Sequence, residues 1–277
     1  MSIITISHEA FDHGRAVAER VAEILGYRCI SREVLIKASE RYGIAQAKLF
    51  EALEEKPHRW WAELLENRGV YRIALQAALC EFAQQGDIVY HGRAGQELLR
   101  GIRHVLNVFV DSPRLFRIEQ VKARKGLTEE AANEYLEKAD KIRTRRLKEL
   151  FRIDWRDPSR YDFVLNTAKM SVETAARFIA EVSQREEYQP TPESLQAIKD
   201  LTINARVQAV LITSPEIQIS NIEVKTRNGE VFVSGVLQAA GLERLIVDTI
   251  RKVPGVTGVQ PFFVVAVADQ YIYSDGR

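Results

Sequence analysis

Basic side chains are concentrated in one segment of this 277-residue chain, between residues 137 and 160, which holds nine lysines and arginines against five acidic residues. In a helix, Asp140, Arg143 and Arg146 follow one another at intervals of three and therefore share one face. Arginines placed over a phosphoryl group stabilise the charge that develops on it during transfer. The segment therefore predicts a phosphoryl-transfer site, and the alternative is a solvated basic face of a helix.

A second candidate site lies between residues 7 and 16, where an apolar run meets an amphipathic helix. Free backbone amides and the helix dipole attract anions at such a junction. The sequence G-x-x-x-x-G-K-[ST] that usually cradles phosphates is absent, and Gly14-Arg15 stands in the place of its Gly-Lys. Since a guanidinium group can bind phosphate through two parallel hydrogen bonds, Arg15 is expected to hold phosphates here.

Strand-like and helix-like patterns alternate through the first 185 residues. This alternation is typical of an α/β domain with a parallel sheet and helices on both faces. Ligands of such folds bind beyond the carboxyl ends of the strands, so the residues just after Ile6, Tyr90, Val110 and Leu165 are candidates for the site. The apolar runs expected to form strands are residues 3–6, 27–30, 87–90, 105–110 and 161–166. Helices are expected up to Gly26, up to about residue 65, over residues 70–85, from Pro113 onward and over residues 171–185.

The chain changes character after residue 185. A polar stretch with two prolines, residues 186–193, predicts a linker between a domain of residues 1–185 and a second domain of residues 194–277. In the second domain, Asn228-Gly229 is a strong signal for a two-residue β-hairpin. The pattern predicts a small α+β module in the order αββαβ, with helices at about 193–212 and 239–252 and strands at 217–226, 230–236 and 258–267.

Four successive blocks of the first domain resemble the cytidylate kinase-like family, a branch of the nucleoside monophosphate kinases that have a P-loop fold. The blocks are ISHEAFDHGRAVAERVAEILGY (6–27), DIVYHGRAGQELL (87–99), VLNVFVDSPRLFRIEQV (105–121) and YDFVLNTAKMSVETAARFI (161–179). The resemblance implies a P-loop sheet with helices on both faces. It also implies ATP-dependent phosphorylation of a nucleoside monophosphate, most naturally CMP or dCMP, with Mg²⁺ bridging the phosphates.

The resemblance also implies roles for individual residues. Ser7, His13, Gly14 and Arg15 match the loop that binds ATP, and Arg15 is also expected to act in catalysis by holding the donor phosphates. Arg143 and Arg146 match catalytic arginines of a lid over the moving phosphoryl group, with Asp140 as their acidic partner. Arg32, after the second strand, and Arg93, after the third, match residues that bind the acceptor nucleotide, whereas Arg117 is expected to be structural.

The loop departs from the family pattern in ways that leave a second interpretation open. Phe11 and His13 stand where relatives have glycines, Asp12 adds a negative charge, and Ala16 lacks the hydroxyl group that binds magnesium in the standard loop. Glycine permits positive φ and a close approach of the backbone, which larger residues restrict. The alternative function is therefore a catalytically degenerate pseudokinase, acting as a nucleotide sensor or scaffold.

The second domain resembles a BON domain, a small binding module. The resemblance is carried by IEV (222–224), NG (228–229), VFVSGV (231–236) and VPGVTGV (253–259). It implies a module that binds a membrane surface or a protein partner, and no catalytic cluster is visible in it.

Overall composition excludes several classes of function. Lysine plus arginine number 39 and aspartate plus glutamate 38, and a formal net charge of +1 argues against a nucleic-acid-binding domain. The sequence contains no run of about 18 uncharged apolar residues, so it predicts no membrane-spanning helix. Since the first residues also lack a basic secretory leader, we expect a cytoplasmic protein whose Cys29 and Cys80 are reduced.

His13 and His91 are too few ligands for a metal site of side chains alone, and no metal site is expected. The adjacent residues Trp60 and Trp61 are expected to pack the helical acceptor region.

Overall fold

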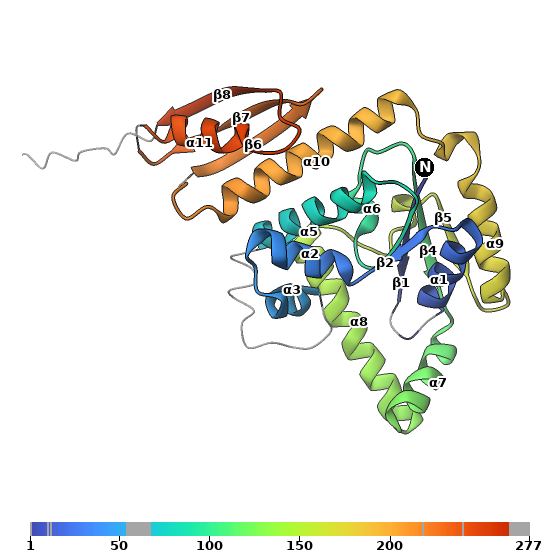
Figure 1. The fold of residues 1–277 in the computed structure, drawn as a ribbon. Coiled ribbons are helices and arrows are strands. Elements are labelled where there is room, and N and C mark those ends of the chain that lie inside the picture. Colours follow the sequence, from blue (N-terminus) through green and yellow to red (C-terminus); the bar gives the residue numbers. More distant parts are fainter. Residues whose placement is uncertain are drawn as a thin grey trace, which may run out of the picture.

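A computed structural model describes residues 2–9, 11, 13–53, 68–217, 219–239 and 241–265. These residues form a five-stranded sheet flanked by helices and a separate three-stranded sheet near the C-terminal end, with a long helix between them (Figure 1). The expected packing role of Trp60 and Trp61 falls outside the described residues.

The five-stranded sheet is entirely parallel, as its continuous apolar runs predict. Its strand order is β2-β3-β1-β4-β5, so β1 lies at the centre, and its side chains Ile3, Ile4 and Ile6 are buried. Because the chain leaves β1 toward neighbours on both sides, a crevice is expected at the carboxyl end of β1. The strands are β1 (Ile3–His8), β2 (Arg28–Ile30), β3 (Ile88–His91), β4 (Val105–Asp111) and β5 (Phe163–Asn166).

Helices cover both faces of this sheet (Figure 1). Helices α1 (Gly14–Leu25) and α9 (Val172–Ser183) pack on one face, where Val17, Val21 and Ile179 join the core of the strands. On the other face lie α2 (Glu33–Tyr42), α3 (Gln46–Leu53), α5 (Arg68–Ala83) and the short α6 (Gly95–Leu98). The sheet thus holds the ends of its strands in fixed positions between two helical layers.

Helices α7 (Arg114–Lys125) and α8 (Glu129–Phe151) form a hairpin that extends away from the sheet (Figure 1). The Thr128 hydroxyl accepts a hydrogen bond from the Ala131 amide at 3.3 Å, which caps the start of α8. Between the two helices, Val121 and Leu136 belong to a small apolar core of their own. The inward face of α8 continues from this core to Asp140, Arg143 and Arg146 at the carboxyl ends of the strands.

The C-terminal module has the expected αββαβ order. Its sheet order is β6-β7-β8, with β6 antiparallel and β8 parallel to β7. At the hairpin, Asn228 and Gly229 both have positive φ, and the Asp200 carboxylate accepts hydrogen bonds from their amides at 2.8 and 2.9 Å. The elements are α10 (Pro192–Thr213), β6 (Ile219–Arg227), β7 (Glu230–Leu237), α11 (Leu242–Arg251) and β8 (Gly258–Val265).

Helix α10 belongs to both cores. Ile198, Ala205 and Ala209 pack with the helices of the N-terminal domain, and Ile203 and Val207 pack inside the C-terminal module. Residues 186–193, which the sequence predicts as a linker, comprise the 3₁₀ turn η2 (Glu186–Tyr188), the Thr191 cap and the first residues of α10. The helix that opens the module therefore also packs against the N-terminal domain.

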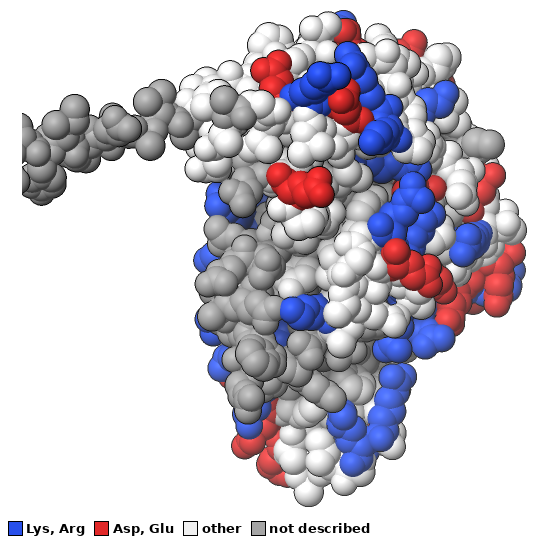
Figure 2. Space-filling view, turned by 60° about the vertical axis from the view of Figure 1, so that its left-hand side comes forward, with Lys and Arg blue, Asp and Glu red and all other residues white. Residues whose placement is uncertain are grey.

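Within the described ranges, no helix is long and apolar enough to span a bilayer. On the face drawn in Figure 2, basic and acidic side chains are interspersed. Both cysteines are free thiols, with Cys80 buried and Cys29 half-buried.

Candidate nucleotide site

The carboxyl ends of the parallel strands bring the candidate residues to one edge of the sheet. Glu9 follows β1, Arg32 lies just beyond β2, and Arg93 lies just beyond β3. Asp111 and Ser112 stand at the end of β4, whose register places Val110 beside His8 of β1. Residues that follow four of the strands are therefore placed at one edge of the sheet.

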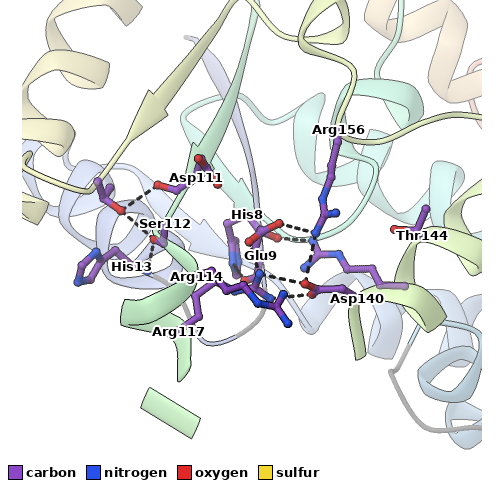
Figure 3. Close-up of polar contacts among 12 residues, drawn as sticks. His8, Glu9, His13, Asp111, Ser112, Arg114, Arg117, Asp140, Thr144 and Arg156 are labelled. Atoms are coloured by element: carbon purple, nitrogen blue, oxygen red, sulfur yellow. Dashed lines mark hydrogen bonds and ion pairs between the residues drawn. The ribbon is translucent and has the colours of Figure 1, made fainter. Parts of the chain in front are cut away.

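Four charged residues from four separate segments form a cluster at the end of β1, which we call the loop–lid cluster: Glu9, Arg117 of α7, Asp140 of α8 and Arg156 (Figure 3). Arg117 forms an ion pair with Glu9 and donates two hydrogen bonds to the Asp140 carboxylate, at 2.7 and 3.0 Å. Arg156 Nη2 lies 2.6 Å from Glu9 Oε1 and 3.4 Å from Asp140 Oδ2. The cluster therefore connects α7 and α8, the helices of the predicted lid, to the loop that follows β1.

Charge is balanced within the loop–lid cluster, because two carboxylates face two guanidinium groups. Glu9, Arg117 and Asp140 are all buried. Burial raises the pKa of the Glu9 carboxyl, while Arg117 and Arg156 act to lower it. Since a buried charge without a partner is strongly destabilising, the three buried members of the cluster depend on one another and on Arg156. Arg117, expected to be structural, lies at its centre.

Arg143 and Arg146 are directed inward. Their residues are 4% and 2% exposed, so the alternative of a solvated helix face is wrong for these two. Arg143 donates a hydrogen bond from Nη2 to the His8 carbonyl, and its guanidinium carbon lies 4.1 Å from the centre of the Trp155 ring. Arg143 therefore reaches the end of β1, where the loop begins.

The described part of the loop keeps features of a phosphate-binding turn. A Cβ atom at Gly14 would lie 2.1 Å from the Cβ of His8, so only glycine fits at the start of α1. Phe11 has φ of 59°, in the left-handed region that glycine adopts most easily. The His13 amide donates to the Ser112 hydroxyl at 3.4 Å, and the His13 ring lies 4.0 Å from that of Phe116. Asp12 falls outside the described residues.

The three other arginines predicted for the site are Arg15, Arg32 and Arg93. Arg15 is on the outer surface of α1, with 74% of its side chain exposed and Nε 2.8 Å from Glu19. Arg32 is exposed at the start of α2, and Arg93 is half-buried with its carbonyl accepting a hydrogen bond from Tyr90 at 3.3 Å. The structure brings Asp140 to the loop with Arg143, but it holds Arg15 away from them.

Ser7 takes part in a buried chain of hydrogen bonds. Its hydroxyl donates to Gln96 Oε1 at 3.0 Å, Gln96 Nε2 donates to the Tyr161 hydroxyl at 3.1 Å, and Tyr161 donates to the Trp155 carbonyl at 2.6 Å. Trp155 in turn supports Arg143 through its ring. The chain therefore links the end of β1 to the segment that positions the lid arginine.

Sequence reasoning missed several polar residues of this edge. Glu9 and Arg156 complete the loop–lid cluster, and the Ser112 hydroxyl lies 2.8 Å from that of Thr167. Ser112 and Thr167 each come within two residues of a strand end that the sequence singles out, so position in the alternating pattern could have found them. No local signal pairs Glu9 with Arg156, because 147 positions separate them.

The end of β3 carries a histidine with a strongly shifted pKa. Burial and the neighbouring His8 lower the pKa of His91 to about 4, and the two rings lie 5.9 Å apart. Both histidines are partly buried beside α1. In the part of the chain that the structure describes, no three His, Cys, Asp or Glu side chains are grouped to hold a metal ion.

The chain belongs to the cytidylate kinase-like family, because residues 3–169 match the model of that family. Residues 199–266 match the model of the BON domain. With the parallel strand order and the helices on both faces, the first match assigns the N-terminal domain to the expected P-loop kinase fold.

Several proteins similar to this chain are named cytidylate kinases. The chain is 26% identical to one from Methanopyrus kandleri over 49% of this chain and 77% of that protein. It is 24% identical to one from Ignicoccus hospitalis over 65% of this chain and 97% of that protein. A crystal structure of an uncharacterized protein from Eubacterium ventriosum has the same fold, with a TM-score of 0.50 and 21% identity over 66% of this chain and 97% of the other.

Proposed function

We propose that the N-terminal domain transfers the γ-phosphoryl group of ATP to a nucleoside monophosphate, with CMP or dCMP as the preferred acceptor. The observation that carries the proposal is that Arg143 and Arg146 are both buried on the inner face of α8, where Arg143 donates a hydrogen bond to the His8 carbonyl at the end of β1. Family membership supports the same class of reaction. Because ATP and nucleoside monophosphates are metabolites of the cytoplasm, the proposal places the protein there.

The reaction is a single displacement at phosphorus. An oxygen of the acceptor's phosphate attacks the γ-phosphorus of ATP, the bond from that phosphorus to the bridging β–γ oxygen breaks, and ADP leaves. The acceptor oxygen is already ionised, so no general base is required. Catalysis consists of positioning and charge stabilisation. Arg143 and Arg146 supply the charge in this proposal, and Arg32 and Arg93 hold the acceptor.

The residues at the loop fit the phosphates of ATP. Gly14 lies at the N-terminus of α1, where amides and the helix dipole favour anions, and its hydrogen atom occupies the space that a Cβ would fill. Ser7 and His13 flank this loop. The Asp111 carboxylate and the Ser112 hydroxyl, at the end of β4, are the oxygen donors that would hold Mg²⁺, which would neutralise charge on the phosphates when bound. Arg15 must turn from Glu19 to contribute.

The direct test measures CDP formation from ATP, Mg²⁺ and CMP with the full chain, and repeats it with other monophosphates. Arg143→Lys keeps the charge but loses the forked geometry, and we expect its kcat to fall by at least roughly 10²-fold. The matched control is Arg145→Ala, an exposed neighbour on the outer face of α8 that pairs with Glu149. No product with any acceptor at high enzyme concentration would overturn the proposal.

The second candidate function is a pseudokinase, and one observation favours it. Glu9 places a carboxylate beside the expected phosphates and pairs with Arg117 and Arg156. A scaffold of this kind would act through the BON domain on a membrane surface or a protein partner. Absence of turnover together with retained binding of ATP would support this alternative.

A further inference from the structure

A cavity of about 250 Å³ lies where the N-terminal domain meets the C-terminal module. Its walls come from the end of α2, the middle of α10 and the segment that begins in α11 and continues beyond it. Since these elements belong to both matched regions of the chain, neither domain forms the cavity alone.

Three cationic side chains line the cavity: Arg41, Arg206 and Lys252. The Glu81 carboxylate lies 3.0 Å from Arg206 Nε and 3.8 Å from Arg41 Nε. It also pairs at 3.0 Å with Lys37, so a single carboxylate already serves three cations. The walls therefore carry excess positive charge, in contrast to the balanced loop–lid cluster.

Apolar side chains form further parts of the wall. They are Val210 of α10 and Val253 and Pro254, which follow α11, while the hydroxyl of the other lining residue, Thr249, donates to the Leu245 carbonyl at 2.7 Å. A bare inorganic ion would leave the apolar walls in contact with water. The combination of cationic donors and aliphatic surface fits a molecule with an anionic head and an apolar body.

We propose that this cavity binds a small phosphate monoester with an apolar substituent. Its phosphate oxygens accept hydrogen bonds from Arg41, Arg206 and Lys252, and its substituent rests on Val210 and Val253. Two guanidinium groups and an ammonium suit a dianion. The site is separate from the nucleotide site, because Arg32 and Arg41 lie at opposite ends of α2, roughly 13 Å apart at 1.5 Å per residue.

The test is isothermal titration of the full chain with phenyl phosphate, with inorganic phosphate as the comparison ligand. We expect saturable one-to-one binding of phenyl phosphate that is tighter than that of inorganic phosphate, since only the former covers the apolar walls. Lys252→Gln should weaken binding by at least roughly tenfold. The matched control is Arg251→Gln, the adjacent exposed residue, which pairs with Asp248 and should leave binding unchanged.

Two further variants test whether phenyl phosphate binds in this cavity. Arg41→Gln removes a second cation from the wall and should weaken binding severalfold without lowering the thermal unfolding midpoint. Arg143→Lys should not alter binding, which separates this cavity from the nucleotide site. Equal affinity in Lys252→Gln and Arg251→Gln, unchanged affinity in Arg41→Gln, equal affinities for the two ligands, or no binding at millimolar phenyl phosphate would each overturn the proposal.

Discussion

Two arginine clusters of this protein differ in how their charge is balanced. In the loop–lid cluster, Arg117 and Arg156 face the two carboxylates of Glu9 and Asp140 (Figure 3). At the junction of the two domains, Glu81 alone serves three cations. The first arrangement satisfies its own charges and holds a lid against a loop, whereas the second has positive charge left over for a ligand. The number of arginines therefore says less about binding than the number of carboxylates beside them.

The largest effect is expected from Arg117→Leu. This change leaves Glu9 and Asp140 buried with only Arg156 to compensate them, and should lower the free energy of unfolding by about 3–5 kcal/mol. Urea unfolding followed by circular dichroism measures it. Arg114→Ala, an exposed residue of the same helix that bonds to Asn133, should change stability by less than about 1 kcal/mol. Equal losses in both variants would contradict a special role for the cluster.

A pH titration tests a third place, the end of β3, which lies beside β1. The pKa of His91 is about 4 in the fold and near 6.5 when the chain is unfolded, so between these pH values the unfolded chain binds a proton that the folded chain does not. The free energy of unfolding should therefore fall as pH falls through this window, by up to about 3 kcal/mol from His91.

The matched comparison for that window is His91→Gln, which cannot be protonated there. Its unfolding free energy should be less sensitive to pH between 6.5 and 4 than that of the parent chain. His104, whose pKa burial also lowers, is present in both proteins and cancels. Parallel curves for the two proteins would contradict the shifted pKa.

A smaller loss of stability is expected when an arginine at the domain junction is replaced by leucine. In Arg206→Leu, the Glu81 carboxylate keeps Lys37 at 3.0 Å and the more distant Arg41. The free energy of unfolding should fall by about 1–2 kcal/mol, measured as for Arg117→Leu. A loss as large as that of Arg117→Leu would mean that the junction has no charge in excess.

The smallest effect on stability is expected at Phe11. Glycine would relieve a positive φ but lose the edge contact with the Tyr135 ring, so Phe11→Gly should stay within about 1 kcal/mol of the parent chain. Affinity for ATP, measured by calorimetry, should rise severalfold because the backbone becomes accessible. Phe11→Ala is the control, since it removes the ring and keeps the strained conformation. A gain equal to that of glycine would show that the ring, and not the backbone, limits binding.

Most of the fold could be predicted from local patterns. Continuous apolar runs separated by helical patterns predict the parallel sheet, because strands covered on both faces need no polar side. Asn228-Gly229 predicts the hairpin, because both residues adopt positive φ. The apolar spacing predicts a helix from residue 239, whereas α11 begins at Leu242, because helix ends depend on capping contacts more than on apolar spacing. Residues 194–213 were assigned to the second domain, yet α10 packs in both cores.

The candidate site was only partly predictable. The spacing of Asp140, Arg143 and Arg146 shows that they share a helix face, and burial confirms that this face is the inner one. The sequence does not show whether an arginine meets phosphate or a carboxylate of the same chain, because the partner comes from a distant segment. Arg15 illustrates the limit, since Glu19, one helical turn away, holds its guanidinium at the surface.

By itself, the sequence determined which segments become strands and helices and which polar residues lie at the ends of the strands, since both depend on the spacing of apolar side chains along the chain. Only the tertiary structure decided that Glu9, Arg117, Asp140 and Arg156 neutralise one another, and that α2, α10 and α11 enclose a basic cavity. The physical reason is that electrostatic balance depends on distance through space, and the members of each cluster come from segments far apart along the chain.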